Sequence, residues 1–298
     1  MVWLPRDLWI KDHDAGIFPA VEGDNAVRLF CLPALSNWRH PEQNVLTQRA
    51  RYYLRNARWE RVATPIGQLQ AYIFEPDDGV AISGTVLLVH GWTGEASFMT
   101  ALAEPIRRAG FRVVLLDLPA HGHSEGRSTN LMECARAVVF VHDALGPFEA
   151  VVTHSFGSMI ALLAAEGVAP MPHGFSTSRF VLIASPNELT DITSSFCEKR
   201  SISTAGRRAF ERRLERIGRR SIGLFNVARL LREARRPALV IHDTKDDDVP
   251  HARAEEIVSA VPGSKLTSFT GLGHRNILFA PPVARAVAAY LKAPVDGC

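Results

Sequence analysis

Short apolar runs alternate with helical segments through most of this 298-residue chain, and this alternation constrains the fold more than any other feature. The runs are rich in Val, Leu and Ile and lack polar alternation, as strands buried on both faces of a parallel sheet do. Repeated strand and helix units of this kind predict an α/β fold with a doubly wound, mostly parallel sheet. The predicted strands are 85–90, 112–117, 150–154, 180–184, 238–242 and 265–269, and the predicted helices are 97–109, 131–145, 155–166, 253–260 and 283–291.

The rest of the chain divides around this core. Residues 59–64 and 69–74 predict an antiparallel hairpin that joins the sheet. Residues 187–236 separate two predicted strands by far more chain than one crossover needs, so they predict a small helical cap insertion. The predicted organisation is a peripheral N-terminal segment at 1–55, a core at 56–186 and 237–298, and a cap at 187–236. Within the first segment we expect irregular structure over 1–40 and an amphipathic helix over 41–55.

The N-terminus carries Arg6, Lys11 and acidic residues where a secretory peptide needs an unbroken apolar stretch. No later run reaches the roughly 18 apolar residues of a membrane-spanning helix. We therefore expect a cytoplasmic protein without stable membrane insertion.

The run VVTHSFG at residues 151–157 joins a buried strand directly to a helix. A serine at so tight a turn presents its hydroxyl above the sheet, beside a helix N-terminus that favours negative charge. Ser155 is therefore the predicted nucleophile, and an ordinary helix N-cap is the alternative. The usual G-x-S-x-G pattern keeps Gly157 but has Thr153 in place of its first glycine, which predicts slight strain or displacement of the turn.

A serine hydroxyl is a weak nucleophile until a base takes its proton and a carboxylate orients that base. Both groups follow Ser155 in the chain, after predicted strands whose carboxyl ends meet at one edge of the sheet. We predict His274 as the base and Asp246 as the orienting carboxylate, because Asp246 lies just past a strand and four residues before Pro250. The same loop holds three other aspartates, of which the first is the alternative: Asp247, Asp243 and Asp248.

An oxyanion hole needs two backbone N–H groups aimed at the carbonyl oxygen as it gains charge. We expect one from Phe156, directly after the nucleophile, and one from Trp92, where Gly91 lets the chain turn close to the substrate. The side chains of Trp92 and Phe156 are also the predicted substrate-binding residues. This chemistry requires no metal and no organic cofactor, and the acidic run 246–248 has no second ligand set beside it.

Five segments together resemble the α/β-hydrolase fold family over roughly residues 59–291: HGWTG at 90–94, DLPAHGHS at 117–124, THSFG at 153–157, the aspartate loop, and GLGH at 271–274. The resemblance implies a carboxylesterase-like serine hydrolase that cleaves an ester-type bond of a small organic substrate through an acyl-enzyme intermediate. It also implies that His90 and His121 brace loops. Thioesterase, lactonase or C–C bond hydrolase activity on the same triad, or a weakly active ligand-binding member of the fold, are the alternatives.

Residues 199–236 contain about a dozen arginines and few acids. A solvated helical face is the simpler interpretation. The alternative is attraction of an anionic substrate, such as a carboxylate or a CoA thioester, or of an anionic membrane surface. The net charge of +3 is too small to imply a nucleic-acid partner.

Overall fold

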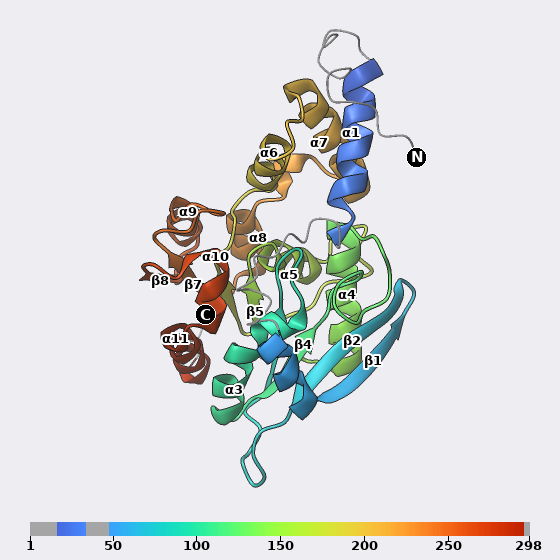
Figure 1. Ribbon diagram of the computed structural model, residues 1–298. Coiled ribbons are helices and arrows are strands. Elements are labelled where there is room, and N and C mark those ends of the chain that lie inside the picture. Colours follow the sequence, from blue (N-terminus) through green and yellow to red (C-terminus); the bar gives the residue numbers. More distant parts are fainter. Residues whose placement is uncertain (1–16, 34–47, 295–298) are drawn as a thin grey trace.

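The computed structural model describes residues 17–33 and 48–294 (Figure 1). In this part of the chain, eight strands form one sheet in the order β1-β2-β4-β3-β5-β6-β7-β8. The β1–β2 and β2–β4 pairs are antiparallel and the other neighbours are parallel, which confirms the predicted hairpin and mostly parallel sheet. The strands are β1 Arg58–Thr64, β2 Gly67–Phe74, β3 Thr85–Val89, β4 Arg112–Leu116, β5 Ala150–His154, β6 Arg179–Ile183, β7 Ala238–Asp243 and β8 Lys265–Phe269.

Helices cover both faces of the sheet, and each face has its own apolar core. Side chains of α4, α5, α8 and α9 fill one core, and those of α3 and α11 fill the other. The central strand β5 is buried along its whole length, which is why it reads as an unbroken apolar run. The helices are α1 Ile17–Phe30, α3 Thr100–Arg108, α4 Leu131–Leu145, α5 Gly157–Glu166, α6 Leu189–Glu198, α7 Thr204–Gly218, α8 Val227–Ala234, α9 Ala252–Ala260, α10 Gly273–Asn276 and α11 Pro281–Lys292, and the 3₁₀ turns are η3 Leu54–Asn56, η4 Ala96–Met99, η5 Ile222–Leu224 and η6 Ile277–Phe279.

The register of the parallel strands brings their carboxyl ends to one edge of the sheet. Val89 pairs with Thr153, and His154 pairs with Ile183. Farther along the sheet, Asp243 at the end of β7 pairs with Phe269 at the end of β8. The loops that follow β3, β5, β7 and β8 therefore start along the same edge of the sheet.

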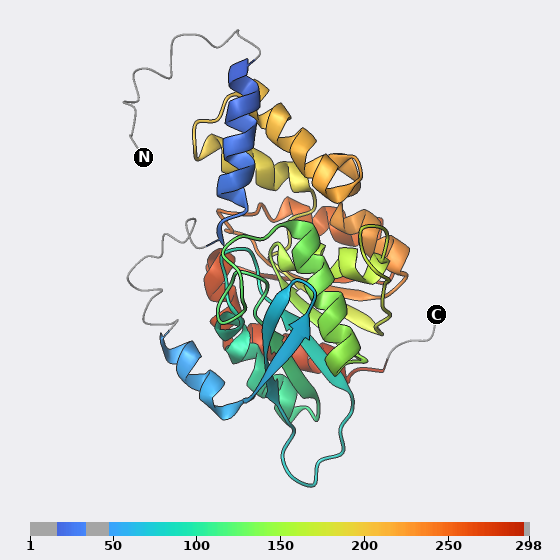
Figure 2. The ribbon, with the colours of Figure 1, turned by 90° about the vertical axis from the view of Figure 1, so that its right-hand side faces the viewer.

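Beyond this edge lie α1, α6 and α7, as Figures 1 and 2 show. The insertion at 187–236 also contains α8, but α8 packs on α5 and α9 and so covers the sheet. We therefore propose a division into an α/β core and a small cap of α1, α6 and α7. None of the helices within 17–33 and 48–294 combines the length and apolarity needed to cross a bilayer.

The expected irregular structure before residue 41 is wrong for residues 17–30, which form α1. Pro19 lies in the first turn of α1, where proline is tolerated, and only a few apolar side chains are buried on this helix, among them Ala26 and Phe30. The weak apolar stripe explains why periodicity did not reveal the helix. Of the amphipathic helix expected over 41–55, residues 41–47 lie outside the described residues, and 48–53 are helical.

Close backbone contact holds α1 against α7. A Cβ atom on Gly23 would lie 2.6 Å from the Cβ of Ala209, so only glycine fits there. Polar contacts flank this point, since the Glu22 carboxylate accepts hydrogen bonds from the Ser203 N–H and hydroxyl, and Arg213 pairs with Asp24. The N-terminal helix is thus an integral part of the cap.

Replacing Gly23 with Val is expected to destabilise the α1–α7 contact by about 1–3 kcal/mol, because the added side chain overpacks the helix pair. Limited proteolysis should then cleave within 17–33 faster than in the wild type. Val21→Ala, on the exposed face of the same helix, is the matched control. Equal cleavage rates for all three proteins would contradict the close contact.

Candidate active site

Ser155 lies in a strained turn between β5 and α5. Its φ is 50°, in the left-handed region that a non-glycine residue rarely adopts, and its N–H donates to the carbonyl of Ile183 at 2.8 Å. The next turn of chain runs against β3, where a Cβ atom on Gly157 would lie 2.6 Å from the carbonyl oxygen of His90. Only glycine fits at 157, and the tight turn lifts the Ser155 hydroxyl above the sheet edge.

Thr153 stands in β5 where the G-x-S-x-G pattern has its first glycine. Its side chain is fully buried in β5, and its hydroxyl lies 2.8 Å from the Ser158 hydroxyl and donates to the Val181 carbonyl at 3.1 Å. The positive φ belongs to Ser155 instead. Thr153 itself is not among the residues with a positive φ, and its hydroxyl has partners at the position where the pattern has glycine. A slight strain or displacement of the turn by Thr153 stays a prediction.

The structure brings Ser155, His274 and Asp246 together. His274 Nε2 lies 3.0 Å from the Ser155 hydroxyl oxygen, and its Nδ1 lies 2.8 Å from Asp246 Oδ2. An ionised carboxylate only accepts, so Nδ1 carries the ring proton and Nε2 is left to accept the Ser155 proton. Asp247, the alternative from sequence, is exposed and has no such contact.

The surroundings of Asp246 keep its carboxylate charged. Burial raises the pKa of Asp246, but the imidazoles of His242 and His274 and the N–H of Val249 outweigh burial and hold the pKa well below its usual range. The Asp248 and Val249 N–H groups donate to Oδ1 at 2.9 and 2.8 Å, which leaves Oδ2 for His274. Asp246 is thus an ionised, fixed acceptor.

Three further residues, which the sequence analysis did not choose for the triad, hold the histidine loop and the aspartate loop in place. His154 Nε2 donates to the His274 carbonyl at 2.8 Å. The Asp243 carboxylate accepts from the Leu272 and Lys245 N–H groups, each at 2.8 Å. His242 is fully buried and its Nε2 donates to the Val249 carbonyl at 2.9 Å. All three stand at strand ends beside predicted site residues, and the sequence analysis considered Asp243 only as another candidate for the orienting carboxylate.

The predicted oxyanion donors flank Ser155. Within the described residues, no acceptor takes the N–H of Trp92 or Phe156, so both remain open to a substrate oxygen. The loop that carries Trp92 is braced from behind, since His90 Nε2 accepts from the Leu118 N–H at 3.1 Å and His121 Nε2 accepts from the Thr93 N–H at 3.3 Å. These contacts are the bracing that the sequence resemblance implies for the two histidines.

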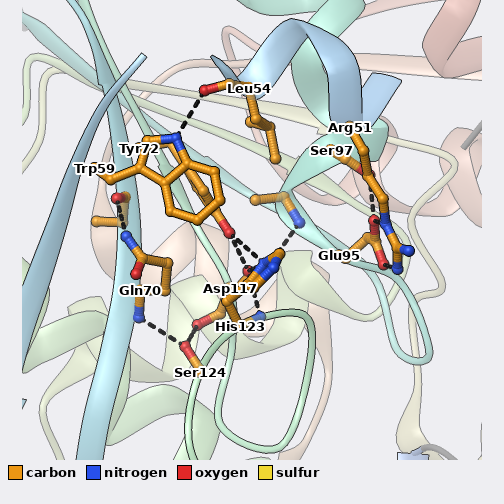
Figure 3. Close-up of polar contacts among 12 residues, drawn as sticks. Arg51, Leu54, Trp59, Gln70, Tyr72, Glu95, Ser97, Asp117, His123 and Ser124 are labelled. Carbon is orange, nitrogen blue, oxygen red and sulfur yellow. Dashed lines mark hydrogen bonds and ion pairs between the residues drawn. The ribbon is translucent and has the colours of Figure 1, made fainter. Parts of the chain in front are cut away.

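A buried polar network fixes the same loop from its other side (Figure 3). The Asp117 carboxylate accepts from the Ala96 and His123 N–H groups and from the Tyr72 hydroxyl, at 2.7, 2.9 and 2.8 Å. Burial raises the pKa of Asp117, although these hydrogen bonds oppose the shift. Glu95 accepts two hydrogen bonds from Arg51 at 2.6 Å and so ties the loop to the helical residues 48–53.

A cleft of about 240 Å³ opens above Ser155 and His274. Aromatic side chains form one wall: Phe30 of α1 stacks on Trp92 with ring centroids 5.4 Å apart and meets Phe156 and Phe196 edge-on at 6.3 and 5.2 Å. Trp92 and Phe156 line the cleft, where the sequence placed them. Phe30 was missed, because its position follows from the docking of α1 on α7.

The rim of the cleft is charged. Lys199 pairs with Asp248 at 3.2 Å, and Arg253 pairs with Asp191 at 2.8 Å. Arg200 instead lies over the Phe196 ring, 4.3 Å from its centroid, and no carboxylate in the described part of the chain pairs with it. Among residues 17–33 and 48–294, no group of three or more His, Cys, Asp and Glu side chains could hold a metal ion.

Comparison with known proteins identifies the family. A model of the alpha/beta hydrolase family matches residues 86–289. The chain belongs to the α/β-hydrolase family. No curated protein matches this chain in sequence.

Solved structures share the fold of this α/β-hydrolase at low sequence identity. A bacterial membrane phospholipase A described as a virulence factor matches with a TM-score of 0.61 and 17% identity, over 91% of this chain and 95% of its own. An esterase domain from Rhodothermus marinus gives 0.55 and 19%, over 79% and 96%. A thioesterase domain from the curacin biosynthetic pathway gives 0.56 and 16%, over 80% and 99%. At such identities the likeness shows the fold alone.

The buried histidines of this α/β-hydrolase predict a loss of stability in mild acid. Burial, together with the charge of His274, lowers the pKa of His154 to about 3, whereas an unfolded histidine titrates near 6.5. Between these values the unfolded state binds more protons, so stability falls as the pH drops from about 6.5 toward 3. At pH 5 this single group costs about 2 kcal/mol.

Urea unfolding at pH 7 and pH 5 measures the effect. His154→Gln keeps an N–H donor for the His274 carbonyl but does not titrate, so its loss of stability on acidification should be smaller by about 2 kcal/mol. An unchanged difference between the two pH values in this variant would refute the assignment.

Proposed function

We propose that the chain is a serine hydrolase, carboxylesterase-like, that cleaves a carboxylic ester of a small organic substrate through an acyl-enzyme intermediate. The observation that carries the proposal is the pair of contacts through His274, 3.0 Å to the Ser155 hydroxyl and 2.8 Å to Asp246, at the floor of a cleft. Membership of the α/β-hydrolase family supports it, because this fold holds its nucleophile, acid and base in the same chain order.

In the first half of the reaction, Ser155 Oγ attacks the ester carbonyl while its proton passes to His274 Nε2. Asp246 stabilises the imidazolium that forms and keeps the ring oriented. The N–H groups of Trp92 and Phe156 donate to the oxyanion of the tetrahedral intermediate. His274 then gives its proton to the leaving alcohol oxygen, the C–O bond breaks, and the acyl group remains on Ser155.

In the second half, His274 Nε2 takes a proton from water as the water oxygen attacks the acyl carbon. The second tetrahedral intermediate uses the same two N–H donors. Its collapse returns the proton from His274 to Ser155 Oγ and releases the carboxylic acid. The cleft wall of Phe30, Trp92, Phe156 and Phe196 suits an apolar portion of the ester next to the reacting carbon.

Ser155→Ala is expected to lower kcat for a p-nitrophenyl ester by about four orders of magnitude or more, with unchanged thermal stability. Asp246→Asn should lower kcat by about 10⁴, because the amide favours the wrong imidazole tautomer. Asp247→Asn, an exposed neighbour, is the matched control and should keep wild-type kcat. Retention of most activity in Ser155→Ala, or an equal loss in Asp247→Asn, would contradict the proposal.

The substrate is further proposed to carry an anionic group that reaches Arg200, the rim cation without a carboxylate partner among the described residues. Arg200→Gln should lower kcat/KM for an ester with a distal carboxylate by about three- to tenfold and leave the neutral ester of equal length unchanged, because exposed charges interact modestly. Arg212→Gln, on an exposed face of α7, is the control. Equal losses for the two esters would remove this preference.

A further inference from the structure

A second hollow, of about 380 Å³, opens at the opposite edge of the sheet, where β6, β7 and β8 begin. It is called the far-edge hollow below. Arg179 is the first residue of β6 and lines the hollow, whereas Ile183 at the other end of β6 accepts the hydrogen bond from Ser155. Roughly 13 Å of strand separates the two ends, so the hollow is distinct from the cleft.

The lining of the far-edge hollow carries only one sign of charge. Five of its residues are basic and none is acidic: Arg179, Arg232, Arg235, Arg236 and Lys265. They come from three separate segments, which are the start of β6, the last turn of α8 with its connection to β7, and the start of β8. Like charges gathered from separate segments repel one another, and they create a positive potential that attracts anions.

Three other arginines of the arginine-rich segment 199–236 are neutralised by carboxylates. Arg207 pairs with Glu211, and Arg220 and Arg229 both pair with Glu166. In the described part of the chain, no carboxylate lies within ion-pair distance of Arg232, Arg235, Arg236 or Lys265, and the Arg179 guanidinium has only Glu149, at 3.9 Å. Arg232, Arg235 and Arg236 of the arginine-rich segment thus line the hollow without a carboxylate partner among the described residues.

Arg179 is held in place before any ligand arrives. Only 6% of the residue is exposed, its Nη1 donates to the carbonyls of Tyr290 and Ala293 at 2.8 and 2.7 Å, and its guanidinium lies 5.7 Å from the centroid of the Tyr290 ring. Two buried polar groups of the lining, Arg179 Nε and the Tyr290 hydroxyl, have no hydrogen-bond partner among the described residues. Buried polar groups almost always have partners, so this pair lacks an acceptor that the described residues do not supply.

We propose that the far-edge hollow binds a small soluble anion that carries two or three linked phosphate groups. Arginine forks match phosphate oxygens in bidentate geometry, and several cations around one hollow match a ligand with several negative charges. The hollow falls within the range of about 300–1,000 Å³ that small-molecule sites occupy. The binding is independent of the chemistry at Ser155.

Isothermal titration of the full chain with sodium tripolyphosphate, at low and constant ionic strength, tests the site. Wild type should bind one equivalent, and the double variant Arg235→Gln/Arg236→Gln should lose about tenfold in affinity. Lys265→Gln, from a different strand, should also weaken binding. The matched control is Arg212→Gln/Arg216→Gln, which removes the same charge from exposed positions of α7 and should leave affinity unchanged.

An equal loss of affinity in the control pair would overturn the proposal, because binding would then depend on net charge alone. The absence of saturable binding by the wild type would overturn it as well. Binding of anionic lipid vesicles without binding of tripolyphosphate would also overturn it. Asp296 lies outside the described residues, so the variant Asp296→Asn is titrated in the same way to test whether this carboxylate takes part in binding. Affinity that is unchanged or higher in this variant agrees with a site built by the five basic residues, whereas loss of binding contradicts it.

Discussion

The contact between His274 and the buried Asp246 carboxylate is the interaction on which the proposed chemistry depends. Two backbone N–H groups hold one oxygen of Asp246, so the other oxygen faces the imidazole. His242 lies 3.4 Å from that second oxygen and helps to keep the carboxylate ionised, which opposes the effect of burial on its pKa. An acceptor that is charged and fixed selects one tautomer of His274, and that tautomer alone leaves Nε2 free to take the serine proton.

The convergence of these groups follows from the sheet rather than from the loops themselves. Because the strands are parallel and in matched register, the carboxyl ends of β3, β5, β7 and β8 lie at one edge of the sheet. At β5 the chain must turn so sharply that Ser155 adopts a left-handed φ, and it does so because Gly157 lets α5 run directly against the carbonyls of His90 and Val89. Local strain at the serine is therefore maintained by packing elsewhere in the core.

Sequence reasoning predicted what depends on local pattern. The core strands read as apolar runs, and the order of Ser155, Asp246 and His274 placed all three side chains at strand ends that the structure brings together. It missed α1, whose few buried side chains find their partners in segments far along the chain, and so it missed Phe30 in the cleft wall. The hydroxyl contacts of Thr153 depend on residues that the local sequence pattern does not show. The same holds for the arginine-rich segment, which places Arg200 at the cleft rim and Arg232, Arg235 and Arg236 at the far-edge hollow.

The most direct test of the central claim is covalent labelling with a fluorophosphonate, followed by digestion and mass spectrometry to locate the adduct. Such a probe reacts with a serine whose proton is taken by a positioned base. The account predicts one adduct, on Ser155, that forms far more slowly when His274 is replaced with Gln in an otherwise folded protein. An adduct on another residue, or labelling of Ser155 at the same rate in His274→Gln, would contradict it.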